Sequence, residues 1–260
     1  MRATRFAVLG LILLGGVNPG CASPPGFAVV ELFTSEGCSS CPPAEAMLAR
    51  LMEETRAEHL PIYAMEWHVD YWDYLGWKDP FDLPEATLRQ EEYAKARAAG
   101  LFTPQAVLNG VVFPDHAWNL SEIRGDARRL MEKPPAVAVS LRVEAGPGPS
   151  ICTLHPSLTG SARGGELQFT LVEDGLGSIP TAGENASRKL HHTHVMRAFR
   201  TMSAKQTPAS GIAFPIPPDV HRADASIVAL VRDPRTLEIL GAAEVPVPLG
   251  DLGGGRPRTP

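Results

Sequence analysis

The chain has 260 residues, of which 44% are apolar and 20% are charged, an ordinary globular composition with ample material for a core. This length is long for one domain and comfortable for two. The formal net charge of −5 argues against a nucleic-acid-binding protein, which usually carries a basic face. The 24 glycines and 25 prolines indicate many turns and irregular or β-rich segments.

Residues 1–22 have the pattern of an export signal. Two arginines are followed by a run at 6–17 that is apolar apart from its glycines, and small residues come next. The run is shorter than the roughly 20 residues that span a bilayer, and its end suits a signal peptidase. The alternative is a lipoprotein acylated at Cys21, although Asn18 and Pro19 are unusual in a lipoprotein signal. We therefore expect an exported protein, periplasmic or secreted, without a membrane span.

A strand, a cysteine pair and a helix follow. Residues 27–33, FAVVELF, are apolar and rich in β-formers, which predicts a buried strand. Residues 42–58 have apolar side chains at helical spacing, and their two leading prolines suit a first helical turn. Cys38 and Cys41 are therefore expected on the N-terminal turn of a helix that follows a buried strand.

The same alternation continues to about residue 133. Residues 60–67 predict a second strand, and residues 84–100 predict a second helix closed by Gly100. TPQAVLNGVVF, residues 103–113, predicts two short strands joined by an Asn-Gly turn. A last helix, capped by Asn119 or by Ser121, is expected to run to Lys133.

The predicted order β-α-β-α-β-β-α, with the cysteines between the first strand and the first helix, resembles the thioredoxin fold. More closely, VVELFTSEGCSSCPPAE, HVDYWDYLGWKDPF and TPQAVLNG resemble a secreted bacterial family catalogued as domain of unknown function 1223. The resemblance covers most of residues 27–133 and, more loosely, the C-terminal half. It implies an α/β thioredoxin-like domain over residues 23–134, and it implies the fold better than the function because the family's reaction is not established.

The pattern changes after residue 134. Short apolar segments alternate with Gly, Pro and Asp: AVAVSLRVEA, ELQFTLVEDG, THVMRAFRTM, IAFPIP and SIVALVRDPRTLEILGAAEVPV. RDPRT, between two apolar runs, predicts a hairpin turn. Several strands without a helical pattern predict a β-sandwich domain over residues 135–249, and residues 250–260 are expected to be disordered.

Cysteines at the start of a helix suit thiol–disulfide chemistry. The thiolate is the attacking species, and the N–H groups and macrodipole of a helix N-terminus lower a thiol pKa. Cys38 is the outer residue of the pair, so we expect it at the exposed end of the turn as the nucleophile, with Cys41 as the resolving thiol. Ser39 and Ser40 could donate hydrogen bonds to the Cys38 sulfur.

Thr103 and Pro104 gain a role from the resemblance. In thioredoxin-like proteins a proline before the third strand is cis and lies against the cysteine pair, and the backbone of its neighbour pairs with the substrate chain. The resemblance therefore implies that Pro104 is cis and that Thr103 positions the substrate.

Glu31 is the charged residue inside the first predicted strand. Burial would raise the pKa of its carboxyl and suit it to exchange a proton with Cys41. The alternative is structural: Glu31 would pair with an arginine or with backbone N–H groups.

Other uses of the cysteine pair stay open. One is a permanent disulfide, although so small a ring is unusual as a structural bond. The other is a copper site, since Cys38, Cys41 and His68 could hold Cu(I), although copper-binding thioredoxin-like proteins usually have a wider cysteine spacing. The aromatic loop at 68–82 could line a substrate groove or cover the core.

The second half carries less chemical signal. In GENASRKLHHTHVMR, His192 and His194 are expected to share one face of a strand, with His191 on the other. No cysteine or carboxylate is placed nearby in sequence to complete a metal site, so hydrogen-bonded or exposed histidines are expected. Cys152 has no sequence partner, and a buried, inert thiol is expected.

Together these patterns predict an exported thiol–disulfide oxidoreductase that acts on a protein thiol or disulfide and needs no cofactor. The alternatives are a copper-binding or copper-delivery protein that uses Cys38, Cys41 and His68, or a partner-binding module with a vestigial thiol pair. The sequence does not predict the direction of electron flow or the oligomeric state.

Overall fold

The computed structural model describes residues 26–162 and 164–249. The predicted signal at 1–22, the lipidation alternative at Cys21 and the predicted tail at 250–260 lie outside these residues. Within the described ranges, no helix is both long enough and apolar enough to cross a membrane.

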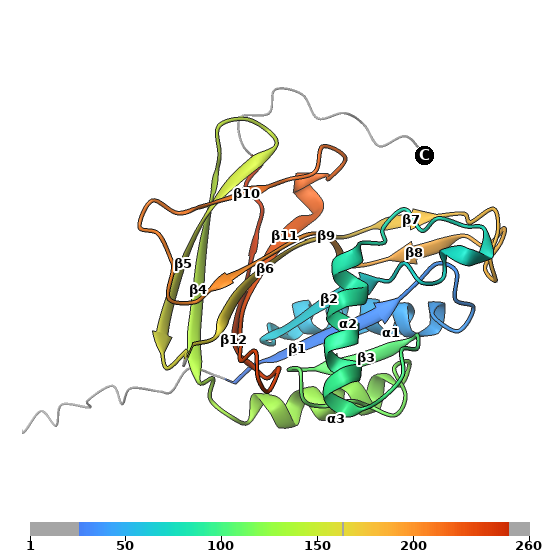
Figure 1. The fold of residues 1–260 in the computed structure, drawn as a ribbon, viewed down its shortest axis with the longest axis horizontal. Helices are drawn as coiled ribbons and strands as arrows, with labels where there is room; N and C mark the ends of the chain where they lie inside the picture. The colour runs from blue at the N-terminus through green and yellow to red at the C-terminus, as the bar shows by residue number, and fades with distance from the viewer. Residues whose placement is uncertain (1–25, 163, 250–260) are drawn as a thin grey trace, which may run out of the picture.

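The first half of the chain alternates strands and helices (Figure 1). Asn119 caps the last of these helices, because its side chain accepts hydrogen bonds from the backbone N–H groups of Ser121 and Glu122. The helix expected to close at Gly100 ends earlier, since Ala98 takes the left-handed conformation with φ 50°. The elements are β1 (Ala28–Thr34), α1 (Pro42–Glu58), β2 (Ile62–His68), η1 (Asp73–Leu75), α2 (Pro84–Arg97), β3 (Gln105–Leu108) and α3 (Leu120–Met131).

The Asn-Gly turn forms as predicted, but the strand expected after it does not. Asn109 and Gly110 have φ angles of 45° and 73°, the left-handed conformations that a tight hairpin turn requires. Beyond the turn the pairing is a single bridge between Leu108 and Val112. Pro114 follows shortly and has no N–H group with which to extend the ladder.

The second half of the described chain is built of strands, with one short 3-10 helix. The RDPRT hairpin turn is confirmed between the last two strands. The strand over residues 151–160 was not predicted, because it contains Pro156 in its interior. Pro156 is tolerated because it lies beyond residues 151–154, which pair with β10. The elements are β4 (Val137–Ala145), β5 (Ile151–Gly160), β6 (Glu166–Glu173), β7 (Leu176–Ser178), β8 (Leu190–His192), β9 (Val195–Ser203), β10 (Ile212–Pro215), η2 (Arg222–Asp224), β11 (Ala225–Arg232) and β12 (Ile239–Pro246).

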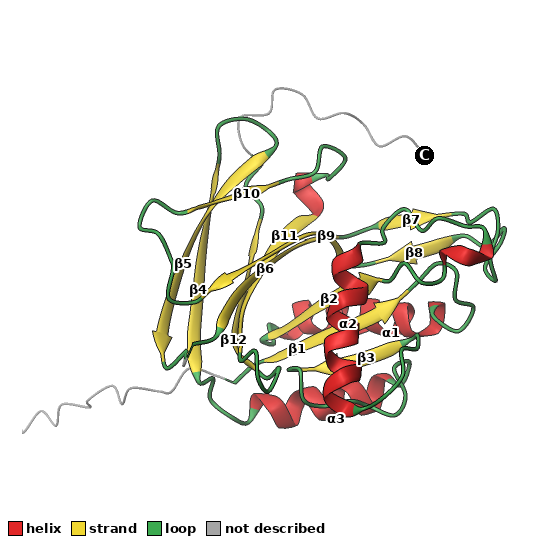
Figure 2. Ribbon diagram, in the orientation of Figure 1, coloured by secondary structure: helices red, strands yellow, loops and turns green. Residues whose placement is uncertain are grey.

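One mixed sheet of seven strands joins the two halves, in the order β12-β11-β6-β9-β2-β1-β3. β1 and β2 are parallel, β3 is antiparallel to β1, and β2 meets β9 at the pair Glu66–Val195. The Glu66 N–H donates to the carbonyl of His194 at 2.9 Å. The sheet is therefore continuous across residue 134, with the helices at one end of the molecule and the all-strand part at the other (Figure 2).

Three apolar clusters fill the layers. One lies between the sheet and α2, and includes Phe33, Trp67 and Tyr93. A second lies on the other face of the sheet, beneath α1 and α3. The third lies between the large sheet and a three-stranded sheet ordered β10-β5-β4. The described chain is thus a mixed α/β fold around one large mixed sheet.

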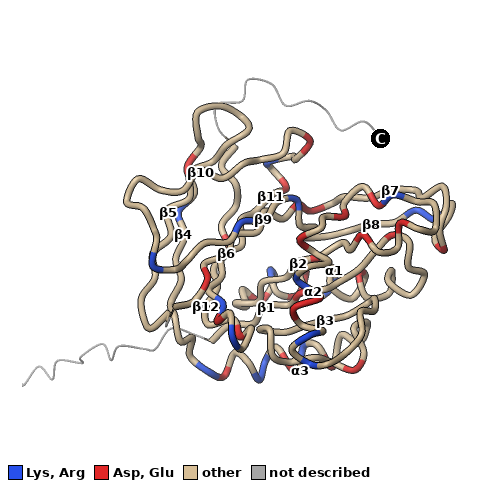
Figure 3. The backbone as a smooth tube through the Cα atoms, in the orientation of Figure 1, with Lys and Arg blue, Asp and Glu red and all other residues tan. Residues whose placement is uncertain are grey.

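Strand alternation decides which polar residues can meet. In β1, Glu31 points toward α2, whereas Thr34 points toward α1 and donates to Glu45 there. In β2, Glu66 and His68 alternate with Met65 and Trp67, which belong to the cluster on the α2 side. Acidic and basic residues are intermixed along the rest of the chain (Figure 3).

Candidate functional site

The two cysteines lie where β1 ends and α1 begins. Cys41 directly precedes the helix, and Pro42 and Pro43 occupy its first two positions, as predicted. Cys38 belongs to a separate turn, in which its N–H donates to the Ser35 carbonyl at 3.1 Å. We call residues 35–41 the thiol turn.

Cys38 is more deeply buried than the sequence suggested. The expectation of an exposed thiol is wrong, since Cys38 is 1% exposed and the exposed residues of the turn are Ser39 and Ser40. The connection between β7 and β8 binds this turn from far along the chain. Glu184 Oε2 accepts from the N–H and the hydroxyl of Ser39 at 2.9 and 2.7 Å, and Asn185 Nδ2 donates to the Cys38 carbonyl at 2.8 Å.

The two thiols differ sharply in acidity. A hydrogen bond from Cys41, opposed by burial and assisted by Ser40 and Thr103, lowers the pKa of Cys38 to about 6. Burial, followed by the contact with Cys38, raises the pKa of Cys41 well above its usual range. The hydrogen bonds around Cys38 therefore favour its thiolate, whereas burial favours the protonated form of Cys41.

The donors to Cys38 are not those expected of a helix N-terminus. The prolines leave the first two helical positions without N–H groups, so the donors are the Cys41 thiol, the side chains of Ser40 and Thr103, and the backbone N–H of Ser40. The Ser40 hydroxyl lies 3.3 Å from the Cys38 sulfur, as the sequence suggested, whereas the Ser39 hydroxyl faces Glu184.

Thr103 and Pro104 lie at the thiols. Their peptide bond is cis, which confirms the expectation for Pro104. The Cys38 thiol points to the Thr103 carbonyl at 3.7 Å, and the Trp72 indole N–H donates to the Thr103 hydroxyl at 2.9 Å. The structure therefore brings together Cys38, Cys41 and Thr103 of the predicted site.

The aromatic loop divides between its two predicted uses. Trp67 of β2, just before the loop, is fully buried in the core, and Tyr71 and Trp72 of the loop pack against the same cluster. Tyr71 and Trp72 are half-buried, and Trp72 reaches the site through Thr103. Tyr74 stacks on Trp72 and is 77% exposed. Part of the loop therefore covers the core and part borders the thiols.

Glu31 lies on the wrong face of β1 for the proton relay. Its carboxylate accepts from Arg89 Nε and from the Tyr93 hydroxyl, the latter at 2.6 Å, and both partners belong to α2. The cysteines lead into α1, on the other face of the sheet. The contacts of Glu31 are those of the structural alternative, an ion pair with an arginine.

A cluster of histidines and carboxylates that was not predicted from the sequence lies on the α1 side of the sheet. His68 Nδ1 lies 2.8 Å from Asp79 Oδ2, and His192 Nε2 lies 3.0 Å from Glu36 Oε1. The two imidazole rings meet edge to face at 4.8 Å, and burial raises the pKa of Glu66 to about 7. We use the name histidine–carboxylate cluster for Glu36, Glu66, His68, Asp79 and His192.

Among the second-half histidines, His191 is exposed and His192 is hydrogen-bonded, as expected, but the expected shared strand face of His192 and His194 is wrong. His192 ends β8, and His194 has a left-handed backbone (φ 51°) before β9, so the two do not share a strand face. His194 instead faces Asp174 and Glu244. Carboxylates do surround His192, but they come from distant segments. One sequence feature could have indicated this cluster: Glu66 and His68 are two residues apart in β2, so strand alternation places both on the same face of the sheet.

Thr34 and Glu45 connect this cluster to the thiol turn. Thr34 contacts the Cys41 thiol and donates to Glu45 Oε1 at 2.5 Å. Glu45 Oε2 then lies 3.5 Å from His192 Nδ1. Among the described residues, the group whose ligand atoms all lie within 4.8 Å of one another is Glu66, His68 and His192, without a cysteine. The proposed copper ligands Cys38, Cys41 and His68 form no such group there.

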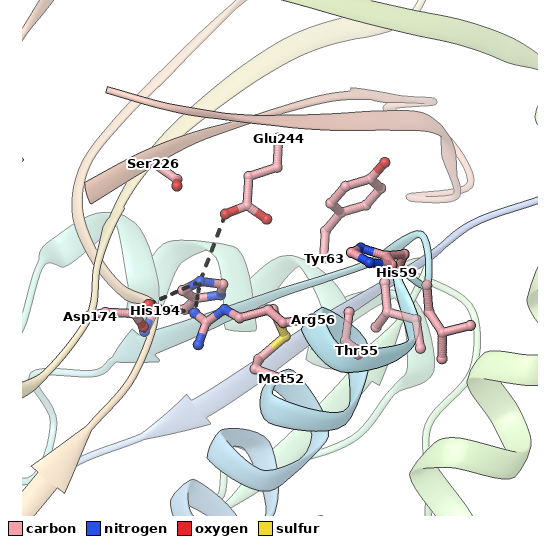
Figure 4. Close-up of a pocket in the computed structure, with 11 residues that line it drawn as sticks. Met52, Thr55, Arg56, His59, Tyr63, Asp174, His194, Ser226 and Glu244 are labelled. Atoms are coloured by element: carbon pink, nitrogen blue, oxygen red, sulfur yellow. Dashed lines mark hydrogen bonds and ion pairs between the residues drawn. The ribbon is translucent and has the colours of Figure 1, made fainter. Parts of the chain in front are cut away.

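Two further features lie apart from the thiols. A pocket of about 560 Å³ opens beside the end of α1, where Arg56 pairs with Asp174 at 2.5 Å and His194 lies beside them (Figure 4). None of the cysteines lines it. Cys152 is buried as predicted, and burial raises its pKa to about 11, so it is an unreactive thiol.

Comparison with solved structures finds the same fold in bacterial proteins. The crystal structure of a protein from Agrobacterium tumefaciens is 25% identical, with a TM-score of 0.61, and covers 90% of this chain and 100% of its own. HBP35 of Porphyromonas gingivalis is 15% identical, with a TM-score of 0.64, and covers 91% of this chain and 80% of its own. No curated protein matches the sequence. Residues 29–232 match the family described as protein of unknown function DUF1223, and the chain belongs to that family.

Proposed function

We propose that the protein is an exported thiol–disulfide oxidoreductase, with a thioredoxin-like unit over residues 23–134 and a β-sandwich unit over residues 135–249. The observation that carries this proposal is two free thiols in contact beside the cis Thr103–Pro104 bond, with the Ser40 hydroxyl 3.3 Å from the Cys38 sulfur. These contacts lower the pKa of Cys38 to about 6, whereas burial raises that of Cys41. A nucleophile and a resolving thiol need this difference, because the first must be charged before reaction and the second must not compete.

The reaction is an exchange of two electrons. The Cys38 thiolate attacks one sulfur of a substrate disulfide, forms a mixed disulfide and releases the other substrate sulfur as a thiolate. Cys41 then gives up its proton and attacks the Cys38 sulfur. The Cys38–Cys41 disulfide forms, and the second substrate sulfur leaves as a thiolate that takes up a proton. The reverse sequence oxidises a substrate dithiol.

The substrate is a protein disulfide, in this proposal, because an apolar exposed surface adjoins the reacting sulfurs. Thr103 and Pro104 would hold the substrate chain beside Cys38. Phe102, next to Thr103, is 54% exposed, and Tyr74, stacked on Trp72, is 77% exposed. Both side chains adjoin Thr103, Phe102 as its neighbour in the chain and Tyr74 through Trp72, and exposed apolar surface gathered at one place is typical of an interaction site.

Access to Cys38 requires a small movement, because its side chain is buried. The contact that borders the exposed part of the thiol turn is Glu184 with Ser39. We propose that an incoming substrate displaces the 179–189 connection at this contact.

Trapping variants test the proposal. Cys38→Ser should form no mixed disulfide and lose exchange, whereas Cys41→Ser should accumulate mixed disulfides that gel electrophoresis without reductant reveals. Cys152→Ser is the matched control and should behave like the wild type. Exchange by Cys38→Ser at the wild-type rate would sink the assignment, and partner capture that survives without both cysteines would favour a vestigial thiol pair.

A further inference from the structure

We propose that Glu66, His68 and His192 form a binding site for a divalent transition-metal ion, with zinc as the ion best suited to their donor atoms. This site differs from the copper site considered above, because no cysteine belongs to it. It does not depend on thiol exchange.

Three buried polar atoms of these residues lack hydrogen-bond partners. In the part of the chain that the structure describes, Glu66 Oε1, His68 Nε2 and His192 Nδ1 are buried and have no hydrogen-bond partner. All three side chains are 0% exposed. Buried polar atoms without a partner are costly and uncommon, so three in one place point to a missing ligand.

The distances between the candidate ligand atoms suit a metal ion. Glu66 Oε2 lies 3.8 Å from His68 Nε2 and 3.8 Å from His192 Nδ1, and all three ligand atoms fit within 4.8 Å. A zinc ion held at about 2.0–2.1 Å by tetrahedral ligands spaces them by roughly 3.4 Å, so small side-chain shifts complete the site. Two imidazoles and a carboxylate are a common donor set for zinc.

Carboxylates hold the two imidazoles in the orientation that metal ligands take. Each turns its other nitrogen to a carboxylate: His68 to Asp79 at 2.8 Å and His192 to Glu36 at 3.0 Å. Metal-bound histidines are held in this way, since the carboxylate fixes the tautomer and orients the free nitrogen toward the ion. Neither nitrogen that faces Glu66 has a hydrogen-bond partner among the described residues, and His192 Nδ1 also lies 3.5 Å from Glu45 Oε2.

The carboxylates around the two histidines contribute negative charge to the site. The histidine–carboxylate cluster holds three carboxylates, and Glu45 adds a fourth at 3.5 Å from His192. No lysine or arginine among the described residues forms a hydrogen bond or ion pair with the cluster. When both imidazoles are neutral, as metal ligands are, a divalent cation would balance the carboxylate charge that no lysine or arginine of the described residues offsets.

The experiment must deliver metal during folding, because the ligands are buried. The mature full-length protein is refolded with Zn²⁺ or with Co²⁺ as a spectroscopic probe, dialysed, and analysed for metal by mass spectrometry. The same is done with a Cys38→Ser, Cys41→Ser background, which removes every thiolate of the thiol turn. Both proteins should retain stoichiometric metal, and the Co²⁺ spectrum should show ligand-field bands without a sulfur charge-transfer band.

Matched variants then locate the ligands. His68→Asn, His192→Asn and the isosteric Glu66→Gln should lower metal affinity by more than about 100-fold, and Asp79→Asn by ~10–100-fold as for an outer-shell partner. His194→Asn, two residues from His192 but outside the cluster, should bind like the wild type. Zinc should also raise the thermal midpoint of the wild type and of His194→Asn, but not that of Glu66→Gln.

Three results would overturn the proposal: a refolded wild type that retains no metal, metal lost with the cysteines, or unchanged affinity in Glu66→Gln or His192→Asn.

Discussion

Two buried carboxylates on neighbouring strands illustrate opposite uses of a charge. Glu31 on β1 faces α2, where Arg89 and Tyr93 satisfy its oxygens. Glu66 on β2 faces α1; its Oε1 has no hydrogen-bond partner among the described residues, and the unpaired nitrogens of two histidines lie 3.8 Å from its Oε2. Protein groups satisfy the carboxylate of Glu31, whereas the groups around Glu66 leave without partners polar atoms that a ligand could bind.

The comparison extends to the cysteines, which lie on the same side as Glu66. Thr34 touches Cys41 and binds Glu45, and Glu45 approaches His192. Free thiols, two imidazoles with one unpaired nitrogen each and carboxylates without a lysine or arginine partner among the described residues therefore gather on the α1 side of the sheet. On the α2 side, Glu31 has an arginine and a tyrosine as partners, so the two buried carboxylates differ in pairing rather than in burial.

Removing Arg89 should give the largest effect on stability. Arg89→Met leaves Glu31 buried without its cation, which should cost about 3–5 kcal/mol in the free energy of unfolding. Urea unfolding measures this cost, and the double variant Glu31→Leu, Arg89→Met should recover much of it. Thiol exchange per folded molecule should not change; a loss of exchange at wild-type stability would restore Glu31 to the proton relay.

Removing Cys41 should give the next largest effect, on the acidity of Cys38. Because the hydrogen bond from Cys41 is the main cause of the low pKa, Cys41→Ala should raise it from about 6 toward the usual ~8.5. The pH dependence of Cys38 alkylation reports the change: the wild type should lose reactivity below about pH 6, and the variant already below about pH 8. Ser40→Ala should shift the midpoint upward by less, and Ser39→Ala should not shift it. An unmoved midpoint in Cys41→Ala would show that other donors set the pKa.

Opening the cover over the thiol turn should have a smaller effect. Glu184→Ala removes both hydrogen bonds to Ser39, so attack on a small disulfide should speed up by a few-fold while the Cys38 pKa stays in place. Stopped-flow kinetics would resolve this, with the exposed Lys189→Ala of the same connection as control. A slower attack in Glu184→Ala would mean that this connection orients the thiol rather than covering it.

The exposed aromatic pair should give the smallest effect. Tyr74→Ala and Phe102→Ala should each raise KM for a protein disulfide by a few-fold, in line with the modest cost of most interface residues. KM for a small disulfide should not change. Equal effects on both substrates would place these residues in the support of the site rather than in recognition.

Local patterns were enough to predict the frame of the site. The apolar run of β1 and the two prolines that open α1 depend on neighbouring residues, so they were enough to predict the place of the cysteines. The place of Thr103 and the cis bond of Pro104 came instead from the resemblance to the thioredoxin fold. The face of Glu31 also follows from strand alternation, but only once β1 is known to lie between α1 and α2.

The rest of the site depends on contacts between distant segments. Asn185 and Cys38 are 147 residues apart, and His192 and Glu36 are 156 residues apart. Their meeting follows from β9 joining the sheet beside β2, which no local pattern predicts. The burial of Cys38 has the same origin, since the connection between β7 and β8 folds back onto the thiol turn.

The reduction potential of the Cys38–Cys41 pair tests the central proposal most directly. The mature protein would be equilibrated in glutathione or dithiothreitol buffers and its thiols counted after alkylation. A thiol–disulfide oxidoreductase should show a reversible two-electron couple at roughly −270 to −120 mV, the range of thioredoxin-like catalysts. A potential below about −300 mV, typical of structural disulfides, or the absence of a reversible couple would contradict the account.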